Sequence, residues 1–239
     1  MKTARVLGEQ GVSVITSTNR PQFFDNILAN YTRQRYRIKE LVIILNKDSM
    51  ELSRYRRLAR AYPHVSVYKL PEKTTLGKCL NYAVSKTKHS FISKFDDDDF
   101  YSPYYLTGQI RAMQRTGADV VGKRAYFAYL EAKKLLVLRF PKQQSKFVGL
   151  VAGGTILFKK RVFGPVRFPN VSLGEDVTFL SRCRSKGYKI FAPAPHNYVQ
   201  IRRKNKKSHT WKGTDAYVLK GSRIVARTVQ YRKLTTKPL

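Results

Sequence analysis

Apolar and polar residues alternate along the first half of the chain in a way that predicts strands followed by helices. Gly11 to Ile15 is a short apolar run rich in β-branched residues, which is typical of a strand. A polar stretch follows and leads to Pro21, a residue that fits the first turn of a helix. The next apolar residues share one face at helical spacing: Phe24, Ile27, Leu28 and Tyr31.

The same pattern recurs three more times. Strands are predicted at residues 41–45, 65–70 and 90–95, and the first of these is apolar throughout, as in a strand covered on both faces. We expect Ser49 and Thr75 to cap the intervening helices. The first of these helices is expected to turn Leu52, Tyr55 and Ala59 inward. The second is expected to turn Cys79, Leu80, Ala83 and Val84 inward. Strands that alternate with helices imply a parallel sheet.

The pattern changes after a fourth helix, which is predicted to start at Ser102 and Pro103, to bury Leu106, Ile110 and Met113, and to end at Gly117. Residues 120–130 and 135–140 are rich in β-branched and aromatic residues and are joined by the short charged segment EAKK, which favours antiparallel pairing. A last helix is expected from Gly174 to Lys186, stopped by Gly187, with Val177, Leu180 and Cys183 inward.

These elements predict an α/β fold with helices on both faces of a mixed sheet and a smaller antiparallel region. No break in composition marks a linker, so we expect a single domain over residues 1–239, with halves at about 11–117 and 118–201. Residues 202–239 contain one acid, Asp215, among twelve lysines and arginines, and are expected to form a partly ordered basic tail.

The charge of the chain is strongly positive: 47 Lys and Arg against 15 Asp and Glu give +32. Such a surface attracts polyanions, including nucleic acids and anionic membranes. Two cysteines imply no disulfide framework. Since the first ten residues lack the apolar core of a signal peptide, and no run approaches the ~20 apolar residues of a membrane span, we expect a cytoplasmic protein.

Four of the acids are adjacent, Asp96 to Asp99, at the end of a predicted strand. Four neighbouring carboxylates repel one another, and a divalent cation among them would relieve this repulsion. Carboxylate oxygens suit Mg²⁺ or Mn²⁺, and ligands of open α/β sheets bind where strands end. The alternative is a solvated loop or a set of acids that cap the next helix.

A second acidic pair, Glu175 and Asp176, stands at the start of the last predicted helix. Acids are favoured at helix N-termini by the macrodipole, which alone could explain them. The functional interpretation makes one of them a general base, a carboxylate that removes a proton from a hydroxyl group.

From about Val12 to Trp211, the chain resembles the family 2 glycosyltransferases, which have the GT-A fold. VSVITSTNRP is similar to the family's first strand and turn, and FDDDDFYSPYYL is similar to its D-x-D metal motif. The resemblance implies that residues 11–117 bind a nucleotide sugar. It implies that Asp98, with Asp96, ligates Mn²⁺ or Mg²⁺. The donor-binding residues implied by these segments are Thr16, Ser17, Asn19, Arg20, Asp96 and Asp97.

Two later segments extend the resemblance to the acceptor side. VAGGTILFKKRVF is similar to the family's Gly-Gly loop, which implies that Gly153 and Gly154 shape the acceptor pocket; a tight turn is the alternative. GEDVTFL is similar to the family's Glu-Asp motif, which implies that Asp176 is the base and that Glu175 lies beside the acceptor. SHTW offers His209 as a third metal ligand, with His196 as its rival, and Trp211 either stacks on a sugar or fills a core.

The chain departs from the family where many relatives carry an aspartate that pairs with uracil. Asn46 stands nearest that position, and Asp48 is the alternative after a shift in the loop. TTLGKCLNYAV resembles the segment before the metal strand, which makes Lys78 a candidate for phosphate binding or else an exposed lysine.

The implied function is an inverting glycosyltransferase that uses a nucleoside-diphosphate sugar, expected to be UDP-linked, and a hydroxyl acceptor such as a glycan, a lipid carrier or a protein. Cell-surface polysaccharide biosynthesis and docking on the inner membrane face fit this function and the charge. The alternatives are a metal-dependent nucleotidyltransferase or nuclease and a nucleic-acid-binding protein.

Overall fold

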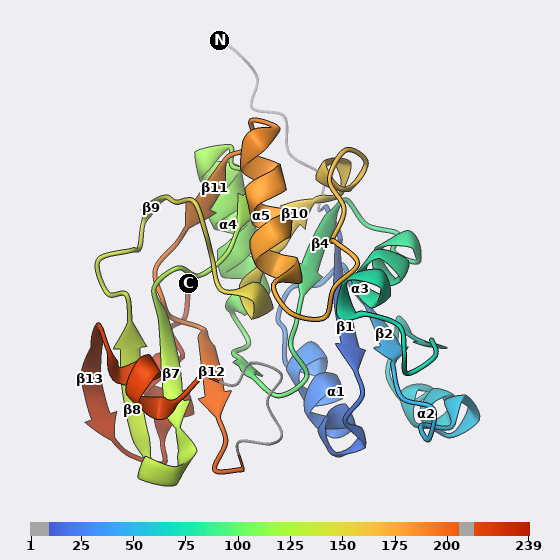
Figure 1. The fold of residues 1–239 in the computed structure, drawn as a ribbon, viewed down its shortest axis with the longest axis horizontal. Helices are drawn as coiled ribbons and strands as arrows, with labels where there is room; N and C mark the ends of the chain where they lie inside the picture. Colours follow the sequence, from blue (N-terminus) through green and yellow to red (C-terminus); the bar gives the residue numbers. More distant parts are fainter. Residues whose placement is uncertain (1–9, 206–212) are drawn as a thin grey trace.

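The computed structural model describes residues 10–205 and 213–239, which form two sheets with helices around them (Figure 1). The larger sheet has eight strands, in spatial order β3 (Val65–Lys69), β2 (Lys39–Leu45), β1 (Val12–Thr18), β4 (Phe91–Lys94), β10 (Leu157–Lys159), β6 (Val120–Val121), β11 (Ile190–Ala192) and β9 (Lys146–Phe147). The first four strands are parallel, as the alternation of strands and helices predicted. β10 then runs antiparallel to both of its neighbours, β4 and β6.

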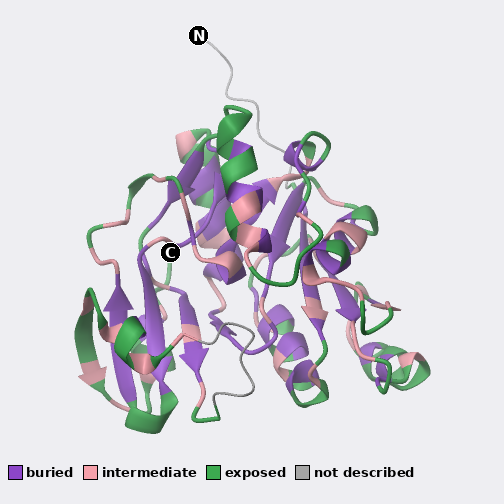
Figure 2. Ribbon diagram, in the orientation of Figure 1, coloured by how far each residue is buried: buried purple, intermediate pink, exposed green. Residues whose placement is uncertain are grey.

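Helices cover both faces of this sheet, which confirms the expected layers. One core cluster contains residues of α1 (Phe24–Thr32), α2 (Leu52–Ala59) and α4 (Tyr105–Thr116). The other contains residues of α3 (Leu76–Ser85) and α5 (Glu175–Ser185). Figure 2 shows the buried strands between helices whose outer faces are exposed. Both cysteines, on α3 and α5, are buried and free.

The helix starts were predicted with mixed success. The Thr75 hydroxyl caps α3 by accepting a hydrogen bond from the Lys78 backbone N–H at 3.3 Å, as expected. Ser49 is not the cap, because α2 begins at Leu52 and its N-cap is Glu51. α4 likewise begins after Tyr104, and Ser102 forms a turn before it by accepting from the Tyr104 backbone N–H at 3.3 Å.

The smaller sheet has five strands, in the order β13 (Ser222–Arg227), β8 (Leu135–Arg139), β7 (Tyr126–Leu130), β12 (Tyr198–Arg202) and β5 (Phe100–Tyr101). The predicted antiparallel pair is confirmed: β7 and β8 are joined through the 3-10 turn η2 (Glu131–Lys133). The single strand expected over 120–130 is wrong, because the chain leaves the larger sheet after Val121 and enters the smaller one at Tyr126.

The C-terminal segment is more ordered than the expected basic tail. Its described part contains α6 (Asp215–Leu219), β13 and α7 (Tyr231–Thr235), and β13 pairs with β8. The Tyr231 ring stacks on Tyr129 at 4.2 Å between centroids, which holds α7 against the outer face of the smaller sheet. The remaining elements are the 3-10 turns η1 (Pro21–Phe23), η3 (Gly153–Thr155) and η4 (Lys160–Phe163). In residues 10–205 and 213–239, no helix is both long enough and apolar enough to cross a membrane.

Candidate active site

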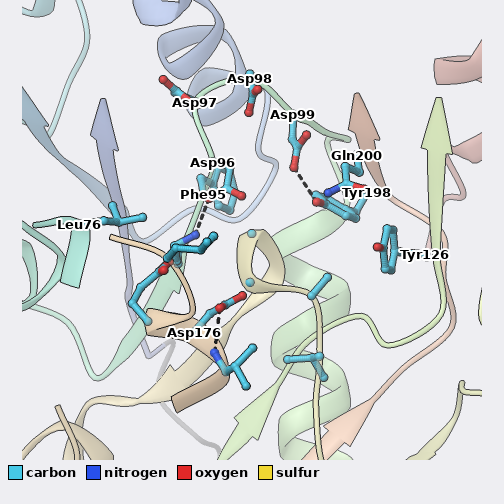
Figure 3. Close-up of a pocket in the computed structure, with 18 of the residues that line it drawn as sticks. Leu76, Phe95, Asp96, Asp97, Asp98, Asp99, Tyr126, Asp176, Tyr198 and Gln200 are labelled. Carbon is cyan, nitrogen blue, oxygen red and sulfur yellow. Dashed lines mark hydrogen bonds and ion pairs between the residues drawn. The ribbon is translucent and has the colours of Figure 1, made fainter. Parts of the chain in front are cut away.

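A cavity of about 610 Å³ opens where β1, β2 and β4 end, and it extends to the inner side of the smaller sheet. In Figure 3, Leu76 lies at one side of it and Tyr126 at the other, with Asp96 and Asp176 between them. The carboxyl edge of a parallel sheet is the usual ligand site of such folds. This geometry brings together most of the residues that the sequence predicted.

The cavity is lined by eleven of the predicted site residues: Ser17, Asn19, Arg20, Asn46, Asp96, Asp97, Asp98, Gly153, Gly154, Glu175 and Asp176. Thr16 and Lys78 are not among them, since Thr16 is fully buried in β1 and Lys78 is exposed on the outside of α3. His209 and Trp211 lie outside the described residues. Asp48 is exposed in a loop beside Glu72, so Asn46 is the residue that faces the cavity.

His196, the rival metal ligand, does not line the cavity. Its ring lies 5.5 Å from that of Phe127, and Phe127 belongs to the separate core on the outer face of the smaller sheet. Burial and the nearby Lys237 and Lys123 lower the pKa of this histidine. The structure therefore separates His196 from the aspartates.

Arg20 neutralises the centre of the aspartate run. Its guanidinium pairs with Asp97, with an Nε–Oδ2 distance of 3.1 Å, and with Asp98 at 3.0 Å. The Thr18 hydroxyl donates to Asp97 at 2.6 Å. Burial alone would lower the pKa of Arg20, but the charges of Asp97 and Asp98 raise it above its usual value. The repulsion that suggested a cation is thus partly relieved by the protein itself.

Two asparagines of α1 fix the backbone of the aspartate run. The Asn26 amide donates to the carbonyls of Asp97 and Asp99 at 2.7 and 3.1 Å, and the Asn30 amide donates to Asp99 at 2.9 Å. The Asp99 carboxylate accepts from the Tyr198 hydroxyl at 2.5 Å and from the Ile201 backbone N–H at 3.0 Å. Asp99 therefore joins the aspartate run to β12, and its carboxylate has a structural role.

Lys94 is a cavity-lining residue that the sequence reasoning missed. It lies on β4, its side chain is 5% exposed, and its ammonium group pairs with the Asp96 carboxylate. Burial alone would lower the pKa of Lys94, but Asp96, Glu175 and Asp176 raise it. A lysine inside a strand of otherwise buried residues was the available signal, because such a charge needs a buried partner.

The Gly153–Gly154 pair lets two carboxylates approach the backbone. A Cβ atom on Gly153 would lie 2.1 Å from Asp176 Oδ2, and one on Gly154 would lie 2.6 Å from Asp96 Oδ2. The Tyr101 hydroxyl donates to the Gly154 carbonyl at 2.6 Å and holds this turn in place. Asp96 and Asp176, 80 residues apart in sequence, therefore flank one small turn.

Gly174 starts α5 in a left-handed conformation, with φ of +81°, and so sets the direction of the two acids that follow. Asp176 Oδ1 accepts from the Val177 backbone N–H at 2.8 Å, and this carboxylate faces the cavity. Glu175 is buried, and burial raises its pKa to about 6, although Lys94 acts in the opposite direction. Val177, predicted to face inward, is 50% exposed because the first turn of α5 lies at the cavity rim.

Comparison with known proteins identifies the family of the chain. The model of glycosyl transferase family 2 matches residues 13–161, which is more than half of the chain. The chain belongs to this family. It is 29% identical to the O-antigen biosynthesis glycosyltransferase WbnJ of Escherichia coli over 159 residues, which are 63% of this chain and 62% of that protein.

Solved structures share the fold at low sequence identity. TarS residues 1–349 of S. aureus in complex with UDP-GlcNAc gives a TM-score of 0.63 at 14% identity over 84% of this chain and 62% of that one. The mannosyltransferase PcManGT of Pyrobaculum calidifontis in complex with GDP-Man and Mn²⁺ gives a TM-score of 0.64 at 17% identity, over 84% of this chain and 59% of that one. The chain thus has the GT-A fold and matches about three fifths of the length of these relatives.

Proposed function

We propose that the chain is an inverting glycosyltransferase that moves a sugar from a nucleoside-diphosphate sugar to a hydroxyl acceptor in cell-surface polysaccharide biosynthesis. The observation that carries this proposal is that Asp96 and Asp176 flank the Gly153–Gly154 turn on one cavity. Family membership and the similarity to an O-antigen biosynthesis enzyme support the reaction class.

Asp176 is the general base in this proposal. Its carboxylate accepts the proton of the acceptor hydroxyl as that oxygen attacks the anomeric carbon of the donor. The bond from this carbon to the diphosphate breaks on the opposite face, so the configuration inverts. The ammonium group of Lys94 pairs with Asp96 and lies close enough to Asp176 to interact with its charge.

The donor occupies the end of the cavity where β1 and β2 finish. Ser17 lies near the end of β1, Asn19 and Arg20 follow this strand, and Asn46 follows β2, so these polar groups can bind the ribose and the nucleobase. We expect a UDP-linked donor. The complex of a structural neighbour with UDP-GlcNAc supports this expectation, and the one with GDP-Man makes GDP the comparison to include.

A divalent metal, Mn²⁺ or Mg²⁺, is part of the proposal. The described residues contain no cluster of three acidic, histidine or cysteine side chains that could hold a metal. Asp96 and Asp98 nevertheless provide oxygen ligands on the cavity wall, with side chains 37% and 11% exposed, and a metal that also binds phosphate oxygens needs only one or two carboxylates. When bound, the ion offsets negative charge on the departing diphosphate.

The charge of +32 supports docking of this enzyme on the anionic cytoplasmic face of a membrane, where each basic residue near the surface contributes about 1 kcal/mol. Binding of the protein to vesicles with and without anionic lipid tests membrane docking independently of the glycosyltransferase activity.

Thermal unfolding with UDP and GDP, each with and without Mn²⁺, tests the central proposal. A ligand that binds the folded state raises the unfolding midpoint, and a hundredfold excess over the dissociation constant corresponds to about 2.7 kcal/mol. We expect a Mn²⁺-dependent rise with UDP that Asp98→Ala removes. No response to any nucleotide, together with salt-sensitive binding to nucleic acid, would overturn the proposal in favour of the alternative function.

A further inference from the structure

The wall of the cavity formed by the smaller sheet is basic and aromatic. Its lining includes Arg124, Tyr126, Arg139, Phe140 and Tyr217, none of which belongs to the predicted site. Tyr126 of this wall lies across the cavity from Leu76 in Figure 3, and Leu76 marks the other end of the cavity. Asp176 lies between the two ends, so this wall is on the acceptor side of the proposed base.

Arg139 is the most constrained cation of this wall. It is 4% exposed, it lies opposite Tyr126 in the β7–β8 pair, and its Nη1 donates to the Tyr126 hydroxyl at 2.8 Å. Its Nε is buried without a hydrogen-bond partner. The guanidinium also lies 4.7 Å from the Phe140 ring centroid and 5.4 Å from that of Tyr217. A buried donor of a charged group without a partner is costly, and a ligand could supply the missing acceptor.

Arg124 adds a second positive charge beside Arg139. Its guanidinium lies 4.3 Å from the Phe140 ring centroid. Within residues 10–205 and 213–239, neither arginine pairs with an acid, whereas Arg20 and Lys94 on the opposite wall both do. Arg202 is different, because it donates to the Gly213 carbonyl and lies near the charge of Asp215.

Gln200 provides a complementary polar group on the same side. Its Oε1 is buried without a hydrogen-bond partner and it lines the cavity next to Tyr198 (Figure 3). An unpaired amide oxygen accepts a hydrogen bond from a hydroxyl group and repels an anion. Aromatic rings, an acceptor for hydroxyl groups and two cations together match a saccharide that carries a negative charge.

We propose that Arg124 and Arg139 form a subsite for a phosphate or carboxylate group on a saccharide acceptor, with Gln200 Oε1 accepting a hydrogen bond from a hydroxyl of the same molecule. This inference rests on the proposed function, since it names the acceptor class of that site. Guanidinium groups bind both anions through two parallel hydrogen bonds, so the shared chemistry is an anionic oxygen group.

Calorimetric titration at constant ionic strength tests the subsite. Glucose 6-phosphate and glucuronate are the anionic probes, glucose is the neutral one, and UDP with Mn²⁺ occupies the donor end. The variants are Arg124→Gln and Arg139→Lys. Arg139 is replaced by lysine because loss of the charge at this buried position puts the fold itself at risk. Arg54→Gln, on the exposed surface of α2, is the matched control for loss of one charge.

We expect the wild type to bind at least one anionic probe at least about tenfold more tightly than glucose. A hydrogen bond to a charged group changes the affinity by about this factor. Arg124→Gln should remove this preference and Arg139→Lys should weaken it, whereas Arg54→Gln should retain it. Which probe binds identifies phosphate or carboxylate as the recognised group. UDP should bind all four proteins equally.

Three results separate the alternatives. Equal loss in Arg124→Gln and Arg54→Gln would overturn the subsite, because general charge would explain the binding. Loss of UDP binding in Arg124→Gln, with anionic sugars unaffected, would overturn it by assigning the arginines to the donor diphosphate. Failure of the wild type to bind any nucleotide, with Arg124-dependent binding of an anionic sugar intact, would refute the proposed function and support the subsite.

Discussion

The two walls of the cavity carry opposite charges and balance them in different ways. On the wall built by β1, β4 and α5, Arg20 pairs with Asp97 and Asp98, and Lys94 pairs with Asp96. On the wall of the smaller sheet, Arg124 and Arg139 have no acidic partner among the described residues. The acidic wall is therefore preorganised before any ligand arrives, and the basic wall keeps its charge available to a ligand.

Two buried lysines sharpen this comparison. Both are 5% exposed or less, yet the charges of Asp96, Glu175 and Asp176 overcome burial and raise the pKa of Lys94, whereas burial lowers the pKa of Lys123 to about 7. Lys123 donates to the Ala194 carbonyl at 2.5 Å, and a neutral acceptor does not compensate for a buried charge. The neighbourhood, and not burial itself, decides whether a buried lysine stays charged.

Replacing Asp176 with Asn is expected to give the largest effect on the acidic wall. The amide keeps the shape of the side chain and cannot accept the acceptor proton, so kcat should fall by about 10² to 10⁴. UDP binding in the presence of Mn²⁺ should stay within about twofold of the wild type, because Asp176 is not assigned to the donor. Steady-state kinetics and thermal unfolding measure the two quantities. Full activity in this variant would exclude Asp176 as the base.

Arg20→Gln tests whether the acidic wall depends on its internal cation. The change removes the Arg20 guanidinium from Asp97, whose side chain is 4% exposed, and takes one cation away from Asp98. Breaking such a pair typically lowers the free energy of unfolding by about 3–5 kcal/mol. Urea denaturation at pH 7 measures this loss, and Arg57→Gln on the exposed face of α2 provides the comparison. A loss no larger than that of Arg57→Gln would mean that solvent already screens the aspartates.

The regular elements were largely predictable because their faces follow simple periods. The four apolar residues expected on α1 are all 3% exposed or less, and β2 is buried as its apolar run required. The division of residues 120–130 between two sheets was missed. Gly122, Lys123 and Arg124 interrupt the apolar run at the crossing, but Gly122 and Lys123 are as buried as the strands on either side, so this interruption is not an exposed turn. Side-chain periodicity indicates whether a residue is buried, but it does not indicate which sheet the residue belongs to.

The site residues were predictable where a local sequence motif marks them, and less so where residues distant in sequence meet in space. The aspartate run and Asp176 stood out by their local sequence. Lys94, Arg124 and Arg139 did not, because each is one of 47 basic residues and its role depends on what surrounds it in space. Thr16 was assigned by its place in a turn motif, but it lies within β1 and its side chain is enclosed by the sheet core.

Gly153→Ala should disturb the acidic wall without removing a charge. The new methyl group would lie 2.1 Å from Asp176 Oδ2, so the carboxylate must move. A displacement of about 1 Å in a catalytic group can cost on the order of 10²-fold in rate. Gly164→Ala is the matched control, since its nearest neighbour would be 3.9 Å away. Comparable kcat values for the two alanine variants would show that the position of Asp176 is not critical.

Lys123→Met gives the smallest expected effect and tests the contrast between the two lysines. The pKa of Lys123 falls from 10.5 to about 7 on folding, so between these values the unfolded chain binds a proton that the folded chain does not. The free energy of unfolding therefore rises with pH through this window, and the contribution is lost as the pH falls to 7. From pH 7 to pH 9 it amounts to about 2 kcal/mol. Urea denaturation should detect this rise in the wild type and in Lys142→Met, an exposed control, but not in Lys123→Met. Identical pH profiles for all three proteins would mean that Lys123 stays protonated when it is buried, as Lys94 does.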